Sequence, residues 1–141
     1  NIDMIGRIDE RHMAKNEENY VYIIGGDIIS SGLDSLITAA NAKSGELSLD
    51  DRYNDLRDPN QFYRRSDHWN FGRLGVPFAF FFSGVHADYH QPSDEIEKIR
   101  FEKMKRIIET IYASVLLLAE TDTPPEVDNQ QFINATKVQG R

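Results

Sequence analysis

Apolar runs alternate with helical patterns along much of the chain. Residues 18–27 (ENYVYIIGGD) are a β-branched and aromatic run closed by two glycines, which predicts a strand. Residues 30–45 carry apolar side chains at three- and four-residue spacing and end in a glycine, which predicts a helix. Residues 76–82 (VPFAFFF) are apolar almost throughout, as is typical of a strand covered on both faces. Strand and helix signals in alternation indicate an α/β architecture of layers.

The remaining segments complete this outline. Residues 1–4 alternate apolar and polar side chains like the end of a strand, and residues 46–62 are polar and broken by proline, as in a loop with at most a short strand or turn. Ser66 or Asp67 is placed to cap a short helix that ends before Gly75. The longest predicted helix lies within 93–122. Its apolar residues recur every three or four positions: Phe101, Met104, Ile108, Ile111, Val115 and Leu118.

The last segment differs from the rest in composition. After Thr121 the chain has two prolines and many polar residues, so we expect residues 121–141 to form an irregular tail behind a structured part that spans residues 1–120. The chain opens in mid-pattern, without an initiator methionine or the features of a signal peptide. We therefore expect it to be a piece of a longer protein.

Composition excludes several kinds of partner and site. The 141 residues suit one domain, and the net charge of −7 argues against nucleic acid, which binds basic surfaces. No run approaches the ~18 apolar residues of a membrane span. The chain has no cysteine, so a disulfide framework and thiolate ligands are excluded and any metal must be held by His, Asp or Glu.

Three clusters of chemically capable side chains lie where strands are expected to end. They are Asp3, the pair Asp67 and His68, and the stretch from His86 to Asp94. In open α/β sheets the loops at the carboxyl ends of strands meet at one crevice, so we expect the three clusters to lie together.

Each of these residues also has a purely structural interpretation. Asp3 has the position of a turn or cap residue, His68 that of a helix start, and His90 that of an ordinary loop histidine. A carboxylate such as Asp3 also suits a hard or borderline cation. His86 and His90 stand four residues apart, but the glycine and proline around them argue against a helix, so we expect no HxxxH metal pair on one helical face.

Taken as a set, three motifs resemble the M28 family of zinc-dependent exopeptidases. NIDMIGR resembles the family's strand end with a metal-ligand aspartate, and YRRSDHWNFGRLGVPF resembles its S-D-H block followed by a helix and a buried strand. DYHQPSDE resembles its last motif, which carries a metal-ligand histidine. The resemblance covers residues 1–119 and implies a mixed sheet flanked by helices, peptide substrates and a site for two zinc ions.

The resemblance implies a role for individual residues. Asp3 matches the aspartate that binds one zinc ion, and His90 matches the histidine that binds the other. Tyr63 matches a tyrosine that in some members stabilises the oxyanion of the tetrahedral intermediate.

Four further positions match residues around such a site. Asp67, His68 and Asp94 would shape the pocket or support the zinc ligands from behind, and His86 would lie at the rim of the substrate pocket.

The chain also departs from the family pattern. The family's His-x-Asp motif, bridging aspartate and Glu-Glu pair precede the N-I-D-M segment, and nothing precedes it here. We therefore expect the C-terminal portion of a peptidase catalytic domain that binds zinc weakly or not at all and is inactive alone. Strands without their neighbours expose edges, so we also expect self-association.

Two other functions remain open at this point. One is a glutaminyl-cyclase-like acyltransferase, which shares the fold and uses a single zinc ion. The other is a non-catalytic binding domain of the same fold. The compartment is unknown; members of the family are often secreted, so a secreted or periplasmic parent protein fits.

Overall fold

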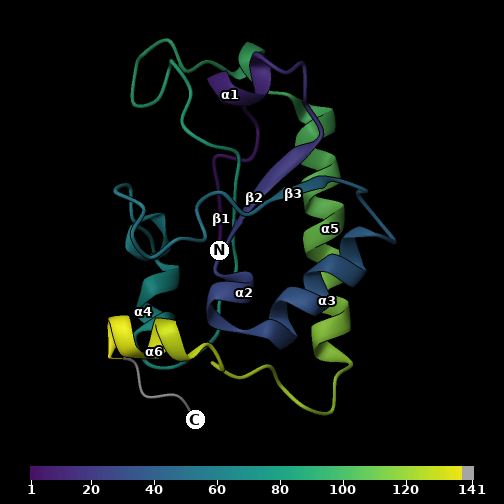
Figure 1. Cartoon of the computed structure of the whole chain (residues 1–141). Helices are drawn as coiled ribbons and strands as arrows, with labels where there is room; N and C mark the ends of the chain where they lie inside the picture. Colours follow the sequence, from purple (N-terminus) through teal and green to yellow (C-terminus); the bar gives the residue numbers. More distant parts are fainter. Residues whose placement is uncertain (138–141) are drawn as a thin grey trace.

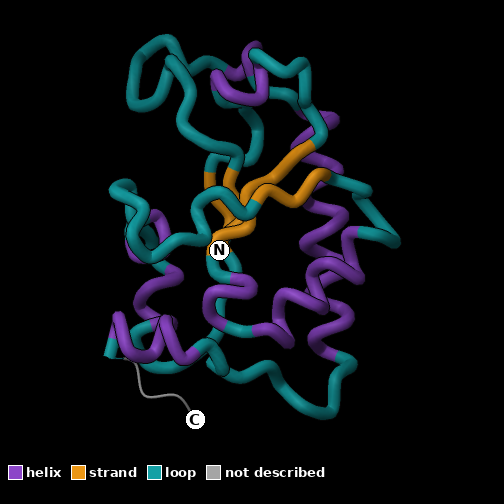
Figure 2. Tube along the Cα trace, in the orientation of Figure 1, coloured by secondary structure: helices purple, strands orange, loops and turns teal. Residues whose placement is uncertain are grey.

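The computed structural model describes residues 1–137 and contains a mixed sheet of four short strands with helices around it (Figures 1 and 2). In the order in which they pair, the strands are β1 (Ile2–Asp3), β4 (Phe80–Phe82), β2 (Tyr20–Ile24) and β3 (Ser48–Asp50). β1 runs parallel to β4, β4 antiparallel to β2, and β2 parallel to β3. The α/β prediction is confirmed, including the mixed sheet flanked by helices.

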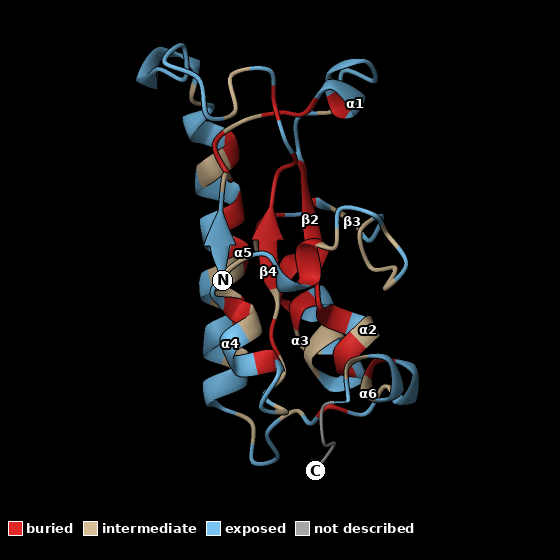
Figure 3. Cartoon of the chain, turned by 90° about the vertical axis from the view of Figure 1, so that its left-hand side faces the viewer, coloured by how far each residue is buried: buried red, intermediate tan, exposed pale blue. Residues whose placement is uncertain are grey.

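The central strands β2 and β4 are buried on both faces because their side chains alternate between two cores. Tyr22 and Phe82 point into one core with most of the buried aromatic residues, whereas Val21 and Phe81 point into the second. All eight residues of these two strands are buried (Figure 3). This confirms a doubly covered strand within the predicted range 76–82, although only residues 80–82 belong to the sheet.

Different elements cover the two faces. The helices α3 (Ser31–Asn41) and α5 (Phe101–Ala119) lie side by side on one face, as Figure 1 shows. The opposite core is closed by the loop after β3, the 3₁₀ turn η1 (Phe62–Arg64) and the C-terminal residues. The remaining helical elements are short: α1 (Glu10–Met13), α2 (Gly26–Ile29), α4 (His68–Gly72) and η2 (Ile96–Lys98).

Helix α5 forms as predicted, but much of its apolar stripe is not in the core. Its buried residues are Lys103, Ile107, Thr110 and Ser114, while Phe101, Ile108, Val115 and Leu118 of the predicted stripe are exposed. The helix passes close to the turn after α3: a Cβ at Gly45 would lie 2.3 Å from Oγ1 of Thr110, so a residue without a side chain is required there.

The tail is more ordered than its composition predicts. Helix α6 (Gln130–Thr136) follows Asn129, whose side chain accepts a hydrogen bond of 3.0 Å from the backbone N–H of Phe132. Phe132 and Val127 are buried in the aromatic core. The expectation of an irregular tail is therefore wrong for residues 130–136, because burial of two apolar side chains stabilises a short capped helix that the polar composition hides. Residues 138–141 of the expected tail lie outside the described residues.

No helix within residues 1–137 is long and apolar enough to span a membrane.

Candidate functional site

A cavity of about 510 Å³, called here the loop pocket, lies beside the C-terminal end of β1. Asp3 is the last residue of β1 and pairs in register with Phe82, so it stands where β4 also ends. The loop that leaves β4 returns to the same place. The pocket is lined by residues 2–7 and by His86, Asp94, Glu95, Ile96, Ile99 and Met104.

Of the predicted site residues, the structure brings Asp3, His86 and Asp94 together in this pocket. His86 is buried, with its Nε2 atom 3.8 Å from Oδ2 of Asp94. Its Nδ1 atom has no hydrogen-bond partner within residues 1–137. Burial lowers the pKa of His86, and the positive charge of Arg7 lowers it further, so the ring is neutral at pH 7.

Arg7 is the main electrostatic feature of the pocket. Its guanidinium group donates hydrogen bonds to the carboxylates of both Asp88 and Asp94. Asp88 also accepts hydrogen bonds of 2.7 Å each from Oγ of Ser93 and Nζ of Lys98. The bonds from Lys98, Ser93 and Arg7 hold the pKa of Asp88 far below its usual value. The loop after β4 is thus tied to the segment after β1.

His90 lies in this loop but does not line the pocket. The residue is exposed, in a turn rather than a helix, and its backbone has a positive φ of 57°. Its ring stacks on Tyr89 with centroids 3.9 Å apart. Residues 86–90 form loop and turn, as the glycine and proline around them predict.

Asp67 and His68 lie elsewhere. They line a second, largely apolar cavity of about 580 Å³ beside Asn1, at the start of β1. His68 is buried, stacks on Phe80, and has its Nε2 atom 3.0 Å from the backbone oxygen of Phe62. Burial lowers the pKa of His68, so a neutral ring completes the core there.

The expectation that all three clusters meet at one crevice is therefore wrong for this pair. Residues 51–67 contain no strand, so Asp67 and His68 do not follow a strand end. They begin α4, which precedes β4 and packs beside the first residues of that strand.

Tyr63 lies in η1 and is 7% exposed. Its ring packs edge to face on Trp69, with centroids 5.7 Å apart. Tyr63 belongs to the aromatic core and lines neither the loop pocket nor the second cavity.

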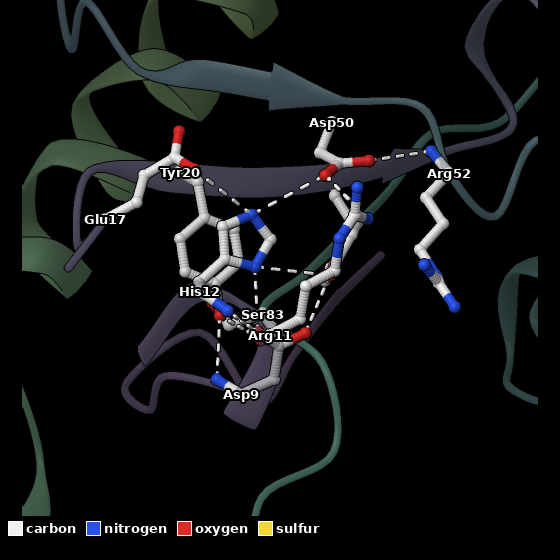
Figure 4. A network of polar contacts seen from close by, with 9 residues as sticks. Asp9, Arg11, His12, Glu17, Tyr20, Asp50, Arg52 and Ser83 are labelled. Carbon is white, nitrogen blue, oxygen red and sulfur yellow. Dashed lines mark hydrogen bonds and ion pairs between the residues drawn. The ribbon is translucent and has the colours of Figure 1, made fainter. Parts of the chain in front are cut away.

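A buried polar network that the sequence patterns did not predict lies beside the site (Figure 4). Asp9 accepts hydrogen bonds from the backbone N–H of His12 at 2.9 Å and from the Tyr22 hydroxyl at 2.6 Å. The His12 ring lies 2.8 Å from the same carboxylate and stacks on Tyr20 at 3.3 Å. Burial raises the pKa of Asp9, but the hydrogen bonds from Tyr22 and His12 outweigh it, so the pKa lies below its ordinary value.

Two signals in the sequence point to this network. Asp9 and His12 have the i, i+3 spacing of a cap and the first turn of a helix, and two tyrosines alternate in the strand that follows. Neither signal shows that the groups meet, because the contact requires β2 to lie against the segment after β1.

A comparison with models of protein families shows to which family the chain belongs. Residues 1–115 match the family model described as peptidase family M28. The chain belongs to peptidase family M28. No curated protein and no solved structure matches this M28 chain.

Membership of the M28 family implies a zinc site. Asp3 and His90 are side chains of the kind that bind zinc, but two donors are too few for a zinc site. Asp3 and His90 are exposed, and neither side chain has a hydrogen bond or ion pair within the described part of the chain. A protein zinc site takes about three protein ligands. Within residues 1–137 no three His, Asp or Glu side chains are grouped to hold a metal ion. These residues by themselves do not form a zinc site.

Proposed function

We propose that residues 1–120 are the C-terminal portion of the catalytic domain of a zinc-dependent aminopeptidase. In this proposal Asp3 donates to one zinc ion and His90 to the other. The observation that carries it is the M28 match, which spans both residues, together with a loop that returns from β4 to the end of β1. Zinc, when bound, supplies an activated water and polarises the carbonyl group of the peptide bond.

The chain's own residues would then orient and support the reacting groups. Asp94 and His86 would form the wall of the loop pocket next to Asp3. Tyr63 has no part in the proposal, because its side chain is packed in the aromatic core and lines neither cavity. The two donors need partners, so the other ligands and the general base would come from residues outside the 141. Alone, the chain would bind zinc weakly and hydrolyse no peptide.

Calorimetric titration with zinc tests the donor assignment. We expect two weak sites in the 141-residue chain, of which Asp3→Asn loses one and His90→Gln the other. Asp55→Asn is the matched control, because Asp55 is an exposed aspartate that pairs only with its neighbour Arg57 within the described residues. An unchanged number of bound zinc ions in both Asp3→Asn and His90→Gln would refute the donor assignment.

Release of amino acids from aminoacyl-4-nitroanilides tests the activity. We expect none from the isolated chain, and measurable activity from it would contradict the proposal. In a longer protein that includes this chain, activity should fall to background in the Asp3 and His90 variants and persist in Asp55→Asn. Cyclisation of N-terminal glutamine without peptide cleavage would favour the acyltransferase instead.

A further inference from the structure

The segment that follows β1 runs alongside the loop that follows β4 and holds it at both ends. This loop, residues 84–95, carries His86 and His90 and is called here the histidine loop. Both segments leave the sheet at the same edge because β1 and β4 are parallel.

The base of the histidine loop is held by Asp9 and Tyr20. The Tyr20 hydroxyl donates a 2.6 Å hydrogen bond to the backbone oxygen of Ser83 and accepts one of 2.9 Å from the N–H of Asp9. Gly84 has a φ of +89°, and a Cβ there would lie 2.5 Å from Oδ2 of Asp9. The first residues of the loop are therefore packed directly on the segment after β1.

The far part of the loop is held by Arg7. Its guanidinium group bonds to Asp88 and Asp94, six residues apart, so a single side chain fixes two points on either side of His90. The Arg7 side chain is only 14% exposed. A planar guanidinium suits two carboxylates at once, whereas the ammonium group of lysine is a compact point charge.

The backbone of His90 also requires such support. Its φ of 57° is uncommon for a residue other than glycine and persists where the surroundings hold it. Backbone hydrogen bonds shape the turn around it. The N–H of Tyr89 donates to the oxygen of His86, that of Gln91 to Asp88, and that of Asp94 to Gln91.

We infer that Arg7 is a positioning residue that fixes the histidine loop, and with it His90, relative to Asp3. Asp3 precedes Arg7 by four residues in the chain. The part of this inference that concerns zinc rests on the proposed function. The part that concerns the loop does not.

Amide hydrogen exchange of the zinc-free chain tests the loop. In Arg7→Met we expect about tenfold faster exchange at Tyr89, Gln91 and Asp94, with the amides of α5 unchanged. Arg57→Met is the control, because Arg57 forms an exposed ion pair with Asp55. Unchanged exchange in the loop of Arg7→Met would overturn the inference.

Zinc titration followed by the NMR signals of the His90 ring tests the effect on the donor. We expect about tenfold weaker zinc binding in Arg7→Met and an intermediate loss in Arg7→Lys. The midpoint of urea unfolding, followed by the signals of α5, should stay near that of the wild type. Binding by Arg7→Met as tight as that of the wild type would refute the positioning of His90. If zinc leaves the His90 signals of the wild type unchanged, the donor assignment of the proposed function fails, and amide exchange still decides the role of Arg7 in the loop.

Discussion

Lys103 is a cation in a place that disfavours charge, and its replacement by methionine should stabilise the fold at neutral pH. Its side chain leaves α5 toward the core and the residue is 3% exposed. The Nζ atom lies 3.2 Å from the centroid of the Tyr20 ring and has no hydrogen-bond partner within residues 1–137. Burial lowers the pKa of Lys103 from 10.5 to about 7, against the attraction of Asp9 and other acidic groups.

The magnitude follows from this difference in pKa. A drop from 10.5 to about 7 corresponds to about 5 kcal/mol, at about 1.4 kcal/mol for each pH unit. The contact between the cation and the Tyr20 ring offsets about 2 kcal/mol of this cost. Methionine has a similar length and no charge, so we expect Lys103→Met to raise the free energy of unfolding by about 3 kcal/mol at pH 6.

The dependence on pH has a definite sign. Below pH 7 Lys103 is protonated in both the folded and unfolded states, so the full cost is present. Between about pH 7 and 10 the unfolded chain binds more protons than the folded chain, so the stability of the wild type rises with pH. The advantage of Lys103→Met should therefore be largest near pH 6 and decline to almost nothing near pH 10.

Urea unfolding monitored by circular dichroism at pH 6, 7, 8, 9 and 10 measures this difference. The matched control is Lys105→Met on the same helix, because the Lys105 side chain is 66% exposed and its Nζ atom lies 3.9 Å from Glu109. The control should show no such trend. A Lys103→Met variant that is less stable than the wild type at pH 6, or an advantage that does not change with pH, would refute the reasoning.

Three further predictions concern the base of the histidine loop and the exposed apolar surface. Gly84→Ala places a Cβ 2.5 Å from the Asp9 carboxylate at a φ of +89°, so urea unfolding should show a loss of about 2–4 kcal/mol; an unchanged midpoint would contradict the contact. Asp9→Asn should cost about 2 kcal/mol at pH 7, because the buried carboxylate accepts hydrogen bonds from Tyr22 and His12. The pKa of Asp9 is lowered, so its contribution is present above pH 4 and lost as pH falls through the folded-state pKa; a difference from wild type that does not shrink as the pH falls below 4 would count against this. The second cavity is bordered by exposed apolar residues such as Val115, so light scattering should show association that grows with concentration and weakens in Val115→Glu. A constant monomer mass would exclude it.

Local patterns in the sequence were enough to predict most of the elements. The β2 and β4 strands, helices α3 and α5 and the α/β class follow from apolar runs and spacing that neighbouring residues determine. Helix α6 was missed, because its stability depends on Phe132 entering a core built by distant residues. The buried face of α5 was likewise not evident, since it depends on contacts with α3 and with Gly45, which lie far from α5 in the chain.

The candidate site divides in the same way. The sequence by itself determined which residues have useful chemistry: Asp3 at a strand end and His90 in a rigid polar loop stand out by residue type and motif. Only the tertiary structure decided which of them meet. It placed His68 in the core beside β4 rather than at the pocket, and it joined Arg7 to Asp94 across 87 positions of the chain. The physical reason is that hydrogen bonds and ion pairs between distant segments depend on how the strands are ordered and paired, which no local pattern of side chains specifies.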